Sequence, residues 1–263
     1  MKMKIAAFNT KKLGWAKVHK NVVRKILIKI MSRYSVVVLL EVLDQTGKAM
    51  EKLLDELNGD NGQHQYNMIC SESLGRSSYK EKFVFFYRVH ELSIIAIYQY
   101  REKGEDVLAR EPFVVLFRRL NAGVRQAVQE LALIPVHTKP EDAERELDAM
   151  VKVVDAVKKR LKTENIMILG DFNADGRYLS GKGRQRVGLS SQHYHWLIDD
   201  DVDTTTSDCN DHTYDRIVVY GQVMVDAVVP DSAQPFNFQR AYQLSDQTAQ
   251  AISDHYPVEV ELK

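Results

Sequence analysis

Short runs of β-branched and aromatic residues recur along the whole chain, and each run is typical of a β-strand. Most of them are continuously apolar and do not alternate with polar residues, as in strands whose two faces are both covered. We therefore predict strands at Ile5–Phe8, Val36–Leu40, Phe83–Tyr87, Ile94–Tyr98, Phe113–Phe117, Leu131–Val136, Ile166–Leu169, Ile217–Tyr220 and Val258–Leu262.

Between these runs lie segments in which apolar residues recur every three or four positions, the spacing of amphipathic helices. The sets are Val22, Ile26 and Ile30, then Leu53 and Leu57, then Leu147, Met150, Val151, Val154, Val157 and Leu161. No repeat, low-complexity segment or Pro/Ser-rich linker divides the chain. We predict one α/β domain over residues 1–263, a four-layer α/β sandwich of two packed mixed β-sheets flanked by helices.

The charge balance argues against binding of nucleic acid by overall charge, but a local basic segment is present. The 263 residues include 36 Lys and Arg against 36 Asp and Glu, which argues against a protein that holds nucleic acid by bulk charge. The segment Arg177–Arg186 is basic and contains glycine. We expect it to be an exposed loop that is either simply solvated or in contact with phosphate groups. Apolar runs such as Val36–Leu40 are too short to cross a bilayer, so we expect no membrane partner.

Two cysteines, Cys70 and Cys209, allow one disulfide at most, and we expect both to be reduced. The first four residues lead directly into a strand, without the apolar stretch of a secretory signal. Either the chain is a mature form or the protein is intracellular. The lack of an Asn-x-Ser/Thr sequon favours the second alternative.

Polar side chains follow several of the predicted strands at the point where each strand ends. The first strand is followed by Asn9, the second by Glu41, the Leu131–Val136 strand by His137, and the Ile166–Leu169 strand by Gly170 and then Asp171 and Asn173. A rigid sheet can direct side chains at its strand ends into one cleft. Any one of these residues is explained better as a polar strand cap than as a functional group, but four together indicate a site.

Two further segments add the remaining chemical groups. Asp215 precedes one predicted strand, and Asp254 and His255 precede the last. Carboxylate and amide oxygens suit a hard divalent cation such as Mg²⁺ or Ca²⁺, and no cysteine cluster or HExxH helix suggests zinc. Together with two imidazoles, this set fits hydrolysis of a phosphodiester or phosphomonoester. We expect the other six histidines to be surface residues: His19, His64, His90, His193, His195 and His212.

The motifs around these residues resemble a known superfamily. GDFNAD at Gly170–Asp175, YDRIVV at Tyr214–Val219 and SDHYPVEVEL at Ser253–Leu262 resemble the metal-dependent endonuclease/exonuclease/phosphatase superfamily. KIAAFN at Lys4–Asn9, LGRSSYKEKFVFFYR at Leu74–Arg88 and AREPFVV at Ala109–Val115 are similar to the deoxyribonuclease I family. The resemblance covers essentially the whole chain and implies an endonuclease that cuts double-stranded DNA.

The resemblance implies a role for each matching position. His137 and His255 would be the acid/base pair, oriented by Glu81 and Asp215 respectively. The metal and phosphate cluster would consist of Asn9, Glu41, Asp171, Asn173 and Asp254, with Mg²⁺ or Mn²⁺ as cofactor. DNA would be contacted by Arg76 and Tyr79 in the minor groove and by Lys11, Arg110 and Tyr214 near the backbone. Minor-groove readout is degenerate, so low sequence specificity is expected, with 5′-phosphate and 3′-hydroxyl products.

The chain also departs from the family pattern. The small disulfide loop of the family appears here as Arg101–Asp106 without cysteine, and Gly176 and His212 occupy the places of the usual structural disulfide. Glu111 and Asp203 keep some ligands of the structural calcium sites, so Ca²⁺ remains a candidate ion. A leucine, Leu43, and Lys11 stand where relatives often have arginines, which implies a weaker grip on DNA.

Partners and alternatives follow from the same resemblance. The positions that contact actin in the family are Cys70 and Phe113 here, so actin inhibition is not expected. We expect the protein to be a monomer. The alternative within the superfamily is a phosphatase or sphingomyelinase-type phosphodiesterase, which would share the histidines but leave LGRSSYKE unexplained. A non-catalytic binding module is disfavoured because both histidines and every expected ligand type are present.

Overall fold

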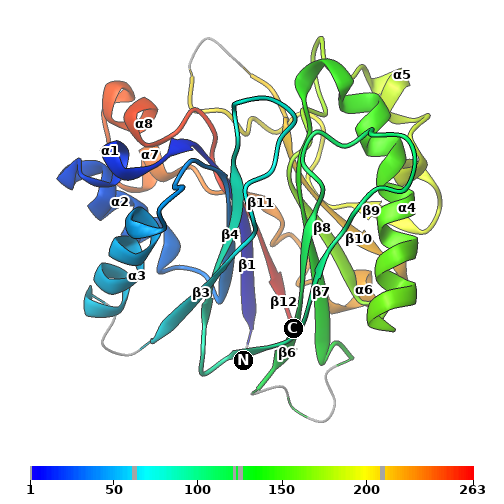
Figure 1. Cartoon of the computed structure of the whole chain (residues 1–263), viewed down its shortest axis with the longest axis horizontal. Coiled ribbons are helices and arrows are strands. Elements are labelled where there is room, and N and C mark those ends of the chain that lie inside the picture. The colour runs from blue at the N-terminus through cyan, green and yellow to red at the C-terminus, as the bar shows by residue number, and fades with distance from the viewer. Residues whose placement is uncertain (1, 61–63, 121–122, 124–126, 208–210) are drawn as a thin grey trace.

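Two mixed six-stranded sheets packed face to face form the centre of the molecule (Figure 1). The computed structural model describes residues 2–60, 64–120, 123, 127–207 and 211–263. The first sheet has the order β11 (Gln234–Pro235), β12 (Val258–Leu262), β1 (Met3–Leu13), β2 (Val36–Val42), β4 (Lys82–Arg88) and β3 (Tyr66–Cys70). The second has the order β5 (Leu92–Gln99), β6 (Phe113–Arg119), β7 (Glu130–His137), β8 (Ile166–Asp171), β10 (Asp215–Tyr220) and β9 (Tyr194–Trp196).

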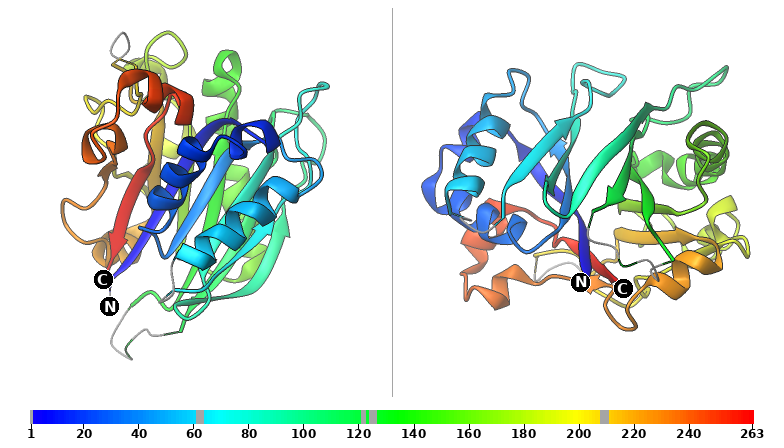
Figure 2. Two further views of the ribbon diagram at one scale, coloured as in Figure 1. Left: turned by 90° about the vertical axis from the view of Figure 1, so that its left-hand side faces the viewer. Right: turned by 90° about the horizontal axis from the view of Figure 1, so that it is seen from below.

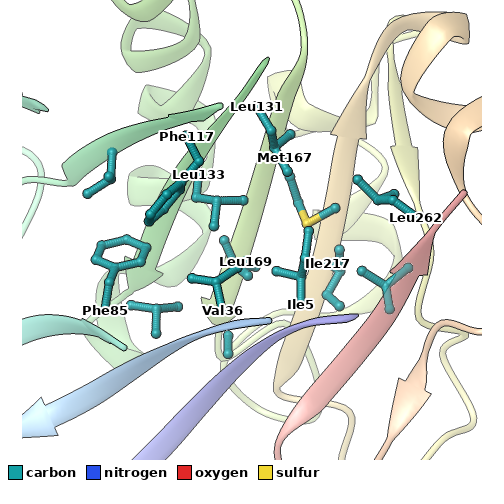
Figure 3. Packing of buried hydrophobic residues seen from close by; sticks show 14 of the residues in the cluster. Ile5, Val36, Phe85, Phe117, Leu131, Leu133, Met167, Leu169, Ile217 and Leu262 are labelled. Carbon is teal, nitrogen blue, oxygen red and sulfur yellow. The ribbon is translucent and has the colours of Figure 1, made fainter. Parts of the chain in front are cut away.

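The central core lies between the two sheets. Ile5, Val36 and Phe85 of the first sheet face Phe117 and Leu169 of the second (Figure 3). Each fully buried side chain of this size contributes about 1.5–3 kcal/mol to folding. The alternate residues of the same strands, such as Ala6 and Phe8, point to the other face of the sheet and pack against the outer helices. Both faces of each central strand are therefore buried, which explains why the apolar runs are continuous.

Helices cover the outer face of each sheet and complete the four predicted layers (Figures 1 and 2). The first sheet is covered by α1 (Trp15–Val18), α2 (Asn21–Met31), α3 (Lys48–Asp60), α7 (Phe238–Ala241) and α8 (Asp246–Ile252). The second is covered by the long α4 (Ala143–Leu161), with α5 (Gly181–Arg184) and α6 (Gly221–Ala227) nearby. Two 3₁₀ turns, Pro140–Asp142 and Gly188–Ser190, lie beside α4. In the part of the chain that the structure describes, no helix is long and apolar enough to span a membrane.

All nine predicted strands are confirmed, and the three described strands that were not predicted are short or partly exposed edge strands. The predicted helices are also present, with one correction. Val22 is 60% exposed, and the buried stripe of α2 runs through Val23, Ile26, Leu27 and Ile30. Assigning Val22 to that stripe was wrong because the apolar residues at both 22 and 23 fit the same spacing, and only packing against α3 and α8 separates them.

The topology brings four strand ends to one edge of the sandwich. Strands β1 and β2 are parallel, as are β7 and β8. In the second sheet, His137 pairs directly with Asp171 in the β7–β8 register. In the first, Asn9 pairs with Leu40, one residue before Glu41. The polar residues that follow these strands therefore meet across the gap between the two sheets.

Candidate active site

Asp171, the last residue of β8, lies at the centre of the site and is almost fully buried. The backbone before it requires glycine: Gly170 has φ +142°, and a Cβ atom there would lie 2.0 Å from the carbonyl oxygen of Val136. This close approach of β8 to β7 sets Asp171 beside His137. The GD pair of the motif is thus explained by backbone geometry as well as by chemistry.

His137 is fixed by a carboxylate from the other sheet. Its Nδ1 donates to Oε1 of Glu81 at 2.6 Å, and Glu81 is buried directly before β4. The second oxygen of Glu81 lies 3.3 Å from the guanidinium of Arg110. Burial lowers the pKa of His137, but the charge and hydrogen bond of Glu81 and the charge of Asp171 together outweigh burial and raise the pKa above its usual value.

His255 forms a matching pair with Asp215. Its Nδ1 donates to Oδ2 of Asp215 at 2.7 Å, and the Thr204 hydroxyl donates to the same oxygen at 3.0 Å. Burial raises the pKa of Asp215 to about 6. Burial also lowers the pKa of His255, but the charges of Asp215 and Asp171 outweigh it and raise the value to about 10. Between these values the two residues form a buried ion pair.

Both imidazoles face Asp171 with their free nitrogen. The Nε2 atoms of His137 and His255 each lie 3.7 Å from Oδ2 of Asp171. Burial raises the pKa of Asp171, but the charges of His255 and His137 outweigh burial and lower it, so the carboxylate is ionised. Because Nδ1 is bonded in each ring, Nε2 is the atom left to exchange a proton with a group placed between the rings.

Asn9 and Glu41 form the other half of this centre. The Nδ2 atom of Asn9 donates to Glu41 at 3.1 Å and to Asp171 at 3.0 Å, so the amide bridges two carboxylates. Its Oδ1 accepts from the backbone N–H of Lys11. The chain here leaves regular strand geometry, with positive φ at Lys11, Lys12 and Glu41. The Nδ2 group of Asn9 therefore holds the carboxylate oxygens of Glu41 and Asp171 in position.

The donor set fits a hard divalent cation. Oxygens of Glu41 and Asp171 lie on either side of the Asn9 amide, and ligand atoms of Asp171, Asp215 and His255 lie within 4.8 Å of one another. Carboxylate and amide oxygens are the ligands that Mg²⁺, Mn²⁺ and Ca²⁺ prefer. Because Asp215 is held by His255 and Thr204, the residues best placed to hold an ion are Glu41 and Asp171.

The two remaining members of the predicted cluster lie beside it. Asn173 has a positive φ, its N–H donates to Asp171, and its side chain donates to the carbonyl of Thr138. The carboxylate of Asp254 is half-exposed and lies 3.3 Å from the ammonium of Lys11 and 3.9 Å from Nε2 of His255. The structure therefore brings together every residue predicted for the catalytic and metal sets.

The predicted DNA-contacting residues surround this centre. The Tyr79 hydroxyl lies 3.4 Å from Glu41, and the ring of Tyr214 lies 6.3 Å from that of His255. Arg76 is paired with Asp106 at 3.0 Å. Arg76, Tyr79 and Arg110 line one surface hollow together with Lys139. Three of the five predicted contacts thus share one hollow, and Arg110 connects it to the Glu81–His137 pair.

The candidate calcium residues already have protein partners. Both oxygens of Glu111 accept hydrogen bonds, from Arg101 and from the N–H of Glu102, each at 2.6 Å. One oxygen of Asp203 accepts from the N–H and hydroxyl of Thr205. An ion at either position would have to displace or share these donors.

The places of the missing disulfide are adjacent in space. A Cβ atom on Gly176 would lie 3.0 Å from the His212 ring, and Gly176 has φ +59°. His212 also lies 3.3 Å from Asp175 and packs on Tyr214. A packed imidazole therefore stands where the resemblance implied a covalent link. Cys70 is a free thiol, whereas Cys209 lies outside the described residues.

The segment Arg177–Arg186 is not a plain exposed loop. Ser180 caps the short helix α5, and Leu179 and Gly183 are buried. Arg184 pairs with Asp200, and Arg186 pairs with Glu144 at 3.0 Å. The loop prediction was wrong because the Ser180 cap and the single buried leucine are weak signals in a basic sequence.

None of the other six histidines is buried, as predicted, and His64 and His90 stack on each other with Glu91 beside them.

Three supporting residues were not predicted from the sequence. Lys17 donates to the carbonyls of Thr10 and Lys11 at 2.7 and 2.9 Å and so holds the irregular end of β1. Thr204 orients Asp215. Arg216 is fully buried, donates to the carbonyls of Thr213, Ile198 and Ala174, and has its pKa lowered to about 10 by burial. Only Arg216 had a signal, since it is part of the YDR motif.

The chain is similar in sequence and in fold to known proteins. A model of the endonuclease/exonuclease/phosphatase family matches residues 7–255. Deoxyribonuclease-1 of Homo sapiens is 44% identical over 266 residues, covering 99% of this chain and 92% of the human protein. Deoxyribonuclease-1 of Oryctolagus cuniculus is 43% identical with the same coverage. A solved endonuclease/exonuclease/phosphatase family structure from Leptotrichia buccalis superposes with a TM-score of 0.68 over 99% of both chains, at 17% identity.

Proposed function

The chain belongs to the endonuclease/exonuclease/phosphatase family and, within it, to the deoxyribonuclease I family, and we propose on this premise that it hydrolyses DNA phosphodiester bonds with a divalent metal ion. The observation that carries the proposal is the pair of imidazoles whose Nε2 atoms lie 3.7 Å from the same Asp171 oxygen. Hydrolysis needs one group that accepts a proton from water and one that protonates the leaving oxygen. Two fixed imidazoles around one position meet that need.

The carboxylates divide the remaining tasks. Glu81 and Asp215 hold the two rings through Nδ1, which keeps Nε2 directed at the substrate. Glu41 and Asp171 would hold the ion, Mg²⁺ or Mn²⁺, with Asn9 fixing their oxygens and with Asn173 and Asp254 beside them. When bound, such an ion supplies positive charge to the phosphoryl oxygens.

The end chemistry follows from which bond breaks. One imidazole takes a proton from water as the water oxygen bonds to phosphorus. The other imidazole gives a proton to O3′ as the P–O3′ bond breaks. The products are then a 3′-hydroxyl and a 5′-phosphate. This assignment is part of the proposal and rests on the family resemblance.

The substrate is proposed to be double-stranded DNA. The hollow lined by Arg76, Tyr79, Arg110 and Lys139 opens beside the imidazoles and combines cations with an aromatic ring. Lys11 lies close to Asp254, and Tyr214 lies close to His255. Contacts of this kind reach the backbone and minor groove, so low sequence specificity is proposed. Structural calcium at Glu111 or Asp203, a monomeric state and the absence of actin inhibition stay predictions.

A plasmid-nicking assay tests this function against its alternative. We expect nicking of supercoiled DNA with Mg²⁺ or Mn²⁺, none in EDTA, and full return of activity when the ion is restored. DNA ligase should seal the nicks directly, because it requires 5′-phosphate and 3′-hydroxyl ends. Sphingomyelin and inositol phosphates serve as parallel substrates. Rapid hydrolysis of either without DNA nicking would replace the proposal with the phosphatase or sphingomyelinase alternative.

A further inference from the structure

A second basic cavity lies away from the imidazoles, between helix α4 and the edge strand β5. This cavity of about 680 Å³ is lined by two tyrosines, Tyr98 and Tyr100, by Ala156, and by six cations: Arg101, Lys103, Lys152, Lys159, Arg160 and Lys162. No carboxylate is among its lining residues. We call it the α4–β5 groove. It belongs neither to the catalytic centre nor to the hollow around Tyr79.

Most of the charge of the α4–β5 groove is not neutralised by ion pairs within the protein. Arg101 pairs with Glu72 and Glu111. The structure records no ion pair with a described carboxylate for the other five cations, in a chain whose net charge is zero. The nearby Asp148 of α4 is engaged elsewhere, since it accepts from the N–H of Gly188. Like charges crowded in a concave wall repel one another and favour binding of an anion.

The helix dipole explains only part of this pattern. Cations in the last turn of a helix gain about 0.3–1 kcal/mol each from the dipole, which accounts for Lys159 and Arg160. It does not account for Lys152, which lies two turns before the end of α4, or for Lys103, which comes from a separate loop. It also does not explain the two tyrosines, which stand edge to face at 6.4 Å with Arg160 over one ring.

The α4–β5 groove is continuous with the proposed DNA-binding hollow. Arg101 lines both the groove and a second hollow that also contains Arg76 and Lys80. Asp106 and Glu111 line this second hollow too, paired with Arg76 and Arg101 respectively. Arg76 in turn lines the hollow with Tyr79 and Arg110 beside the catalytic imidazoles. A series of cationic hollows therefore leads from the cleavage site to α4. A bound strand that leaves the cleavage site along this series passes these paired arginines and Lys80 before it reaches the cations of α4.

We propose that the α4–β5 groove binds the phosphodiester backbone of nucleic acid at a distance from the bond that is cut. This inference rests on the proposed function and adds a second contact region to it. Lysines that follow a groove, with aromatic rings recessed between them, are typical of surfaces that track a nucleic-acid backbone. A membrane surface fits less well, because the rings line a concave wall and do not project from the protein.

A pair of matched double variants tests the groove. Lys152→Gln/Lys159→Gln removes two groove charges, and Lys25→Gln/Lys29→Gln removes two exposed charges from α2 on the other sheet. Binding of duplex DNA is measured in EDTA, which prevents cleavage, with a duplex of about one helical turn and with one several turns long. For the long duplex, the groove variant should lower the slope of log K against log salt by up to about 1.8, because each lost phosphate contact removes about 0.9.

The expected pattern is a loss of affinity for the long duplex alone, with the α2 variant equal to wild type for both lengths. Plasmid nicking should show a raised KM and an unchanged kcat for the groove variant. Equal behaviour of the groove and α2 variants would overturn the proposal. An equal loss for both duplex lengths would also overturn it, since it would place the contact at the cleavage site.

Further outcomes distinguish a groove that binds nucleic acid from one that binds lipid. They also separate failure of the groove proposal from failure of the proposed function. Loss of binding to vesicles of anionic phospholipid, with DNA binding intact, would assign the groove to a lipid surface and overturn the nucleic-acid proposal. A wild-type protein that neither nicks plasmid nor binds DNA would overturn the proposed function together with the groove. If the wild-type protein nicks plasmid and binds DNA and the groove variant behaves in the same way, only the groove proposal would be overturned.

Discussion

The two histidine–carboxylate pairs differ in what stands behind each carboxylate. Glu81 lies between His137 and the guanidinium of Arg110, at 2.6 and 3.3 Å. Asp215 lies between His255 and the hydroxyl of Thr204, at 2.7 and 3.0 Å. A cation behind the carboxylate offsets part of the negative charge that the imidazole experiences, whereas a neutral hydroxyl does not. The same local motif therefore gives two differently tuned rings.

This difference acts on the pKa of each ring. Arg110 lowers the pKa of His137 against the raising effect of Glu81, so the net rise is partly offset. His255 has no such cation among its main influences, and Asp254 adds to the effect of Asp215 and Asp171. The pKa of His255, about 10, is raised strongly as a result. Arg110 therefore opposes protonation of His137, whereas no cation among the main influences opposes protonation of His255. Acid/base catalysis needs one ring in each protonation state.

The largest effect is expected from removing either ring. His137→Ala or His255→Ala should lower the nicking rate by about 10²–10⁴-fold, because each variant removes one proton-transfer partner. His193→Ala removes an exposed imidazole and serves as the matched control. Circular dichroism should match wild type for all three. A rate above about a tenth of wild type for either active-site variant would contradict its acid/base role.

A smaller effect is expected from Lys17, which supports the β1 end beside Asp254. Burial lowers the pKa of Lys17 to about 8, against 10.5 for an unperturbed lysine. Between these values the unfolded chain binds more protons than the folded one, so stability rises with pH by up to about 3 kcal/mol. Urea unfolding from pH 7.5 to 10.5 should show wild type gaining stability relative to Lys17→Met. Parallel pH curves for the two proteins would show that Lys17 titrates normally.

A change confined to one ring is expected from Arg110→Met. Removing this cation should raise the pKa of His137 further, toward the behaviour of His255, and leave His255 unchanged. The measurement is an NMR titration of the ring protons in EDTA. Arg118→Met, at an exposed pair with Glu130, is the control. A pKa of His137 that stays the same or falls would end the comparison drawn between the two pairs.

The smallest effect is expected from reducing agent. On the His255 side, His212 packs against Gly176 where the family has a structural disulfide, so no covalent link stands there. Since Cys70 is a free thiol, dithiothreitol should leave the melting temperature unchanged. A fall of several degrees would show that Cys70 pairs with Cys209 and that a disulfide supports the fold.

The sequence predicted the parts of this molecule that depend on neighbouring residues. Apolar runs predicted nine strands, eight of them inside the two sheets and one, β5, at an edge. Polar residues after those strands predicted Asn9, Glu41, His137 and Asp171. The pairing of Glu81 with His137 joins residues 56 positions apart and followed only from the family resemblance. Edge strands with few buried residues, such as β3 and β9, gave too weak a pattern.

The supporting contacts could not be predicted because no local pattern marks them. Arg110 reaches Glu81 and Thr204 reaches Asp215 only once both sheets are folded. Lys17 looks like any lysine of a short amphipathic helix, and its burial becomes visible only with the irregular β1 end beneath it. The residues that tune the two rings are thus products of tertiary packing.

A double-mutant cycle tests most directly whether the two pairs act as one catalytic unit around Asp171. The nicking rates of His137→Ala, His255→Ala and the double variant are measured with Mg²⁺ under the same conditions. Residues that act as a unit are strongly non-additive, so the double variant should be little slower than the slower single variant. A double variant whose loss equals the product of the two single losses would show two independent contributions and contradict the account.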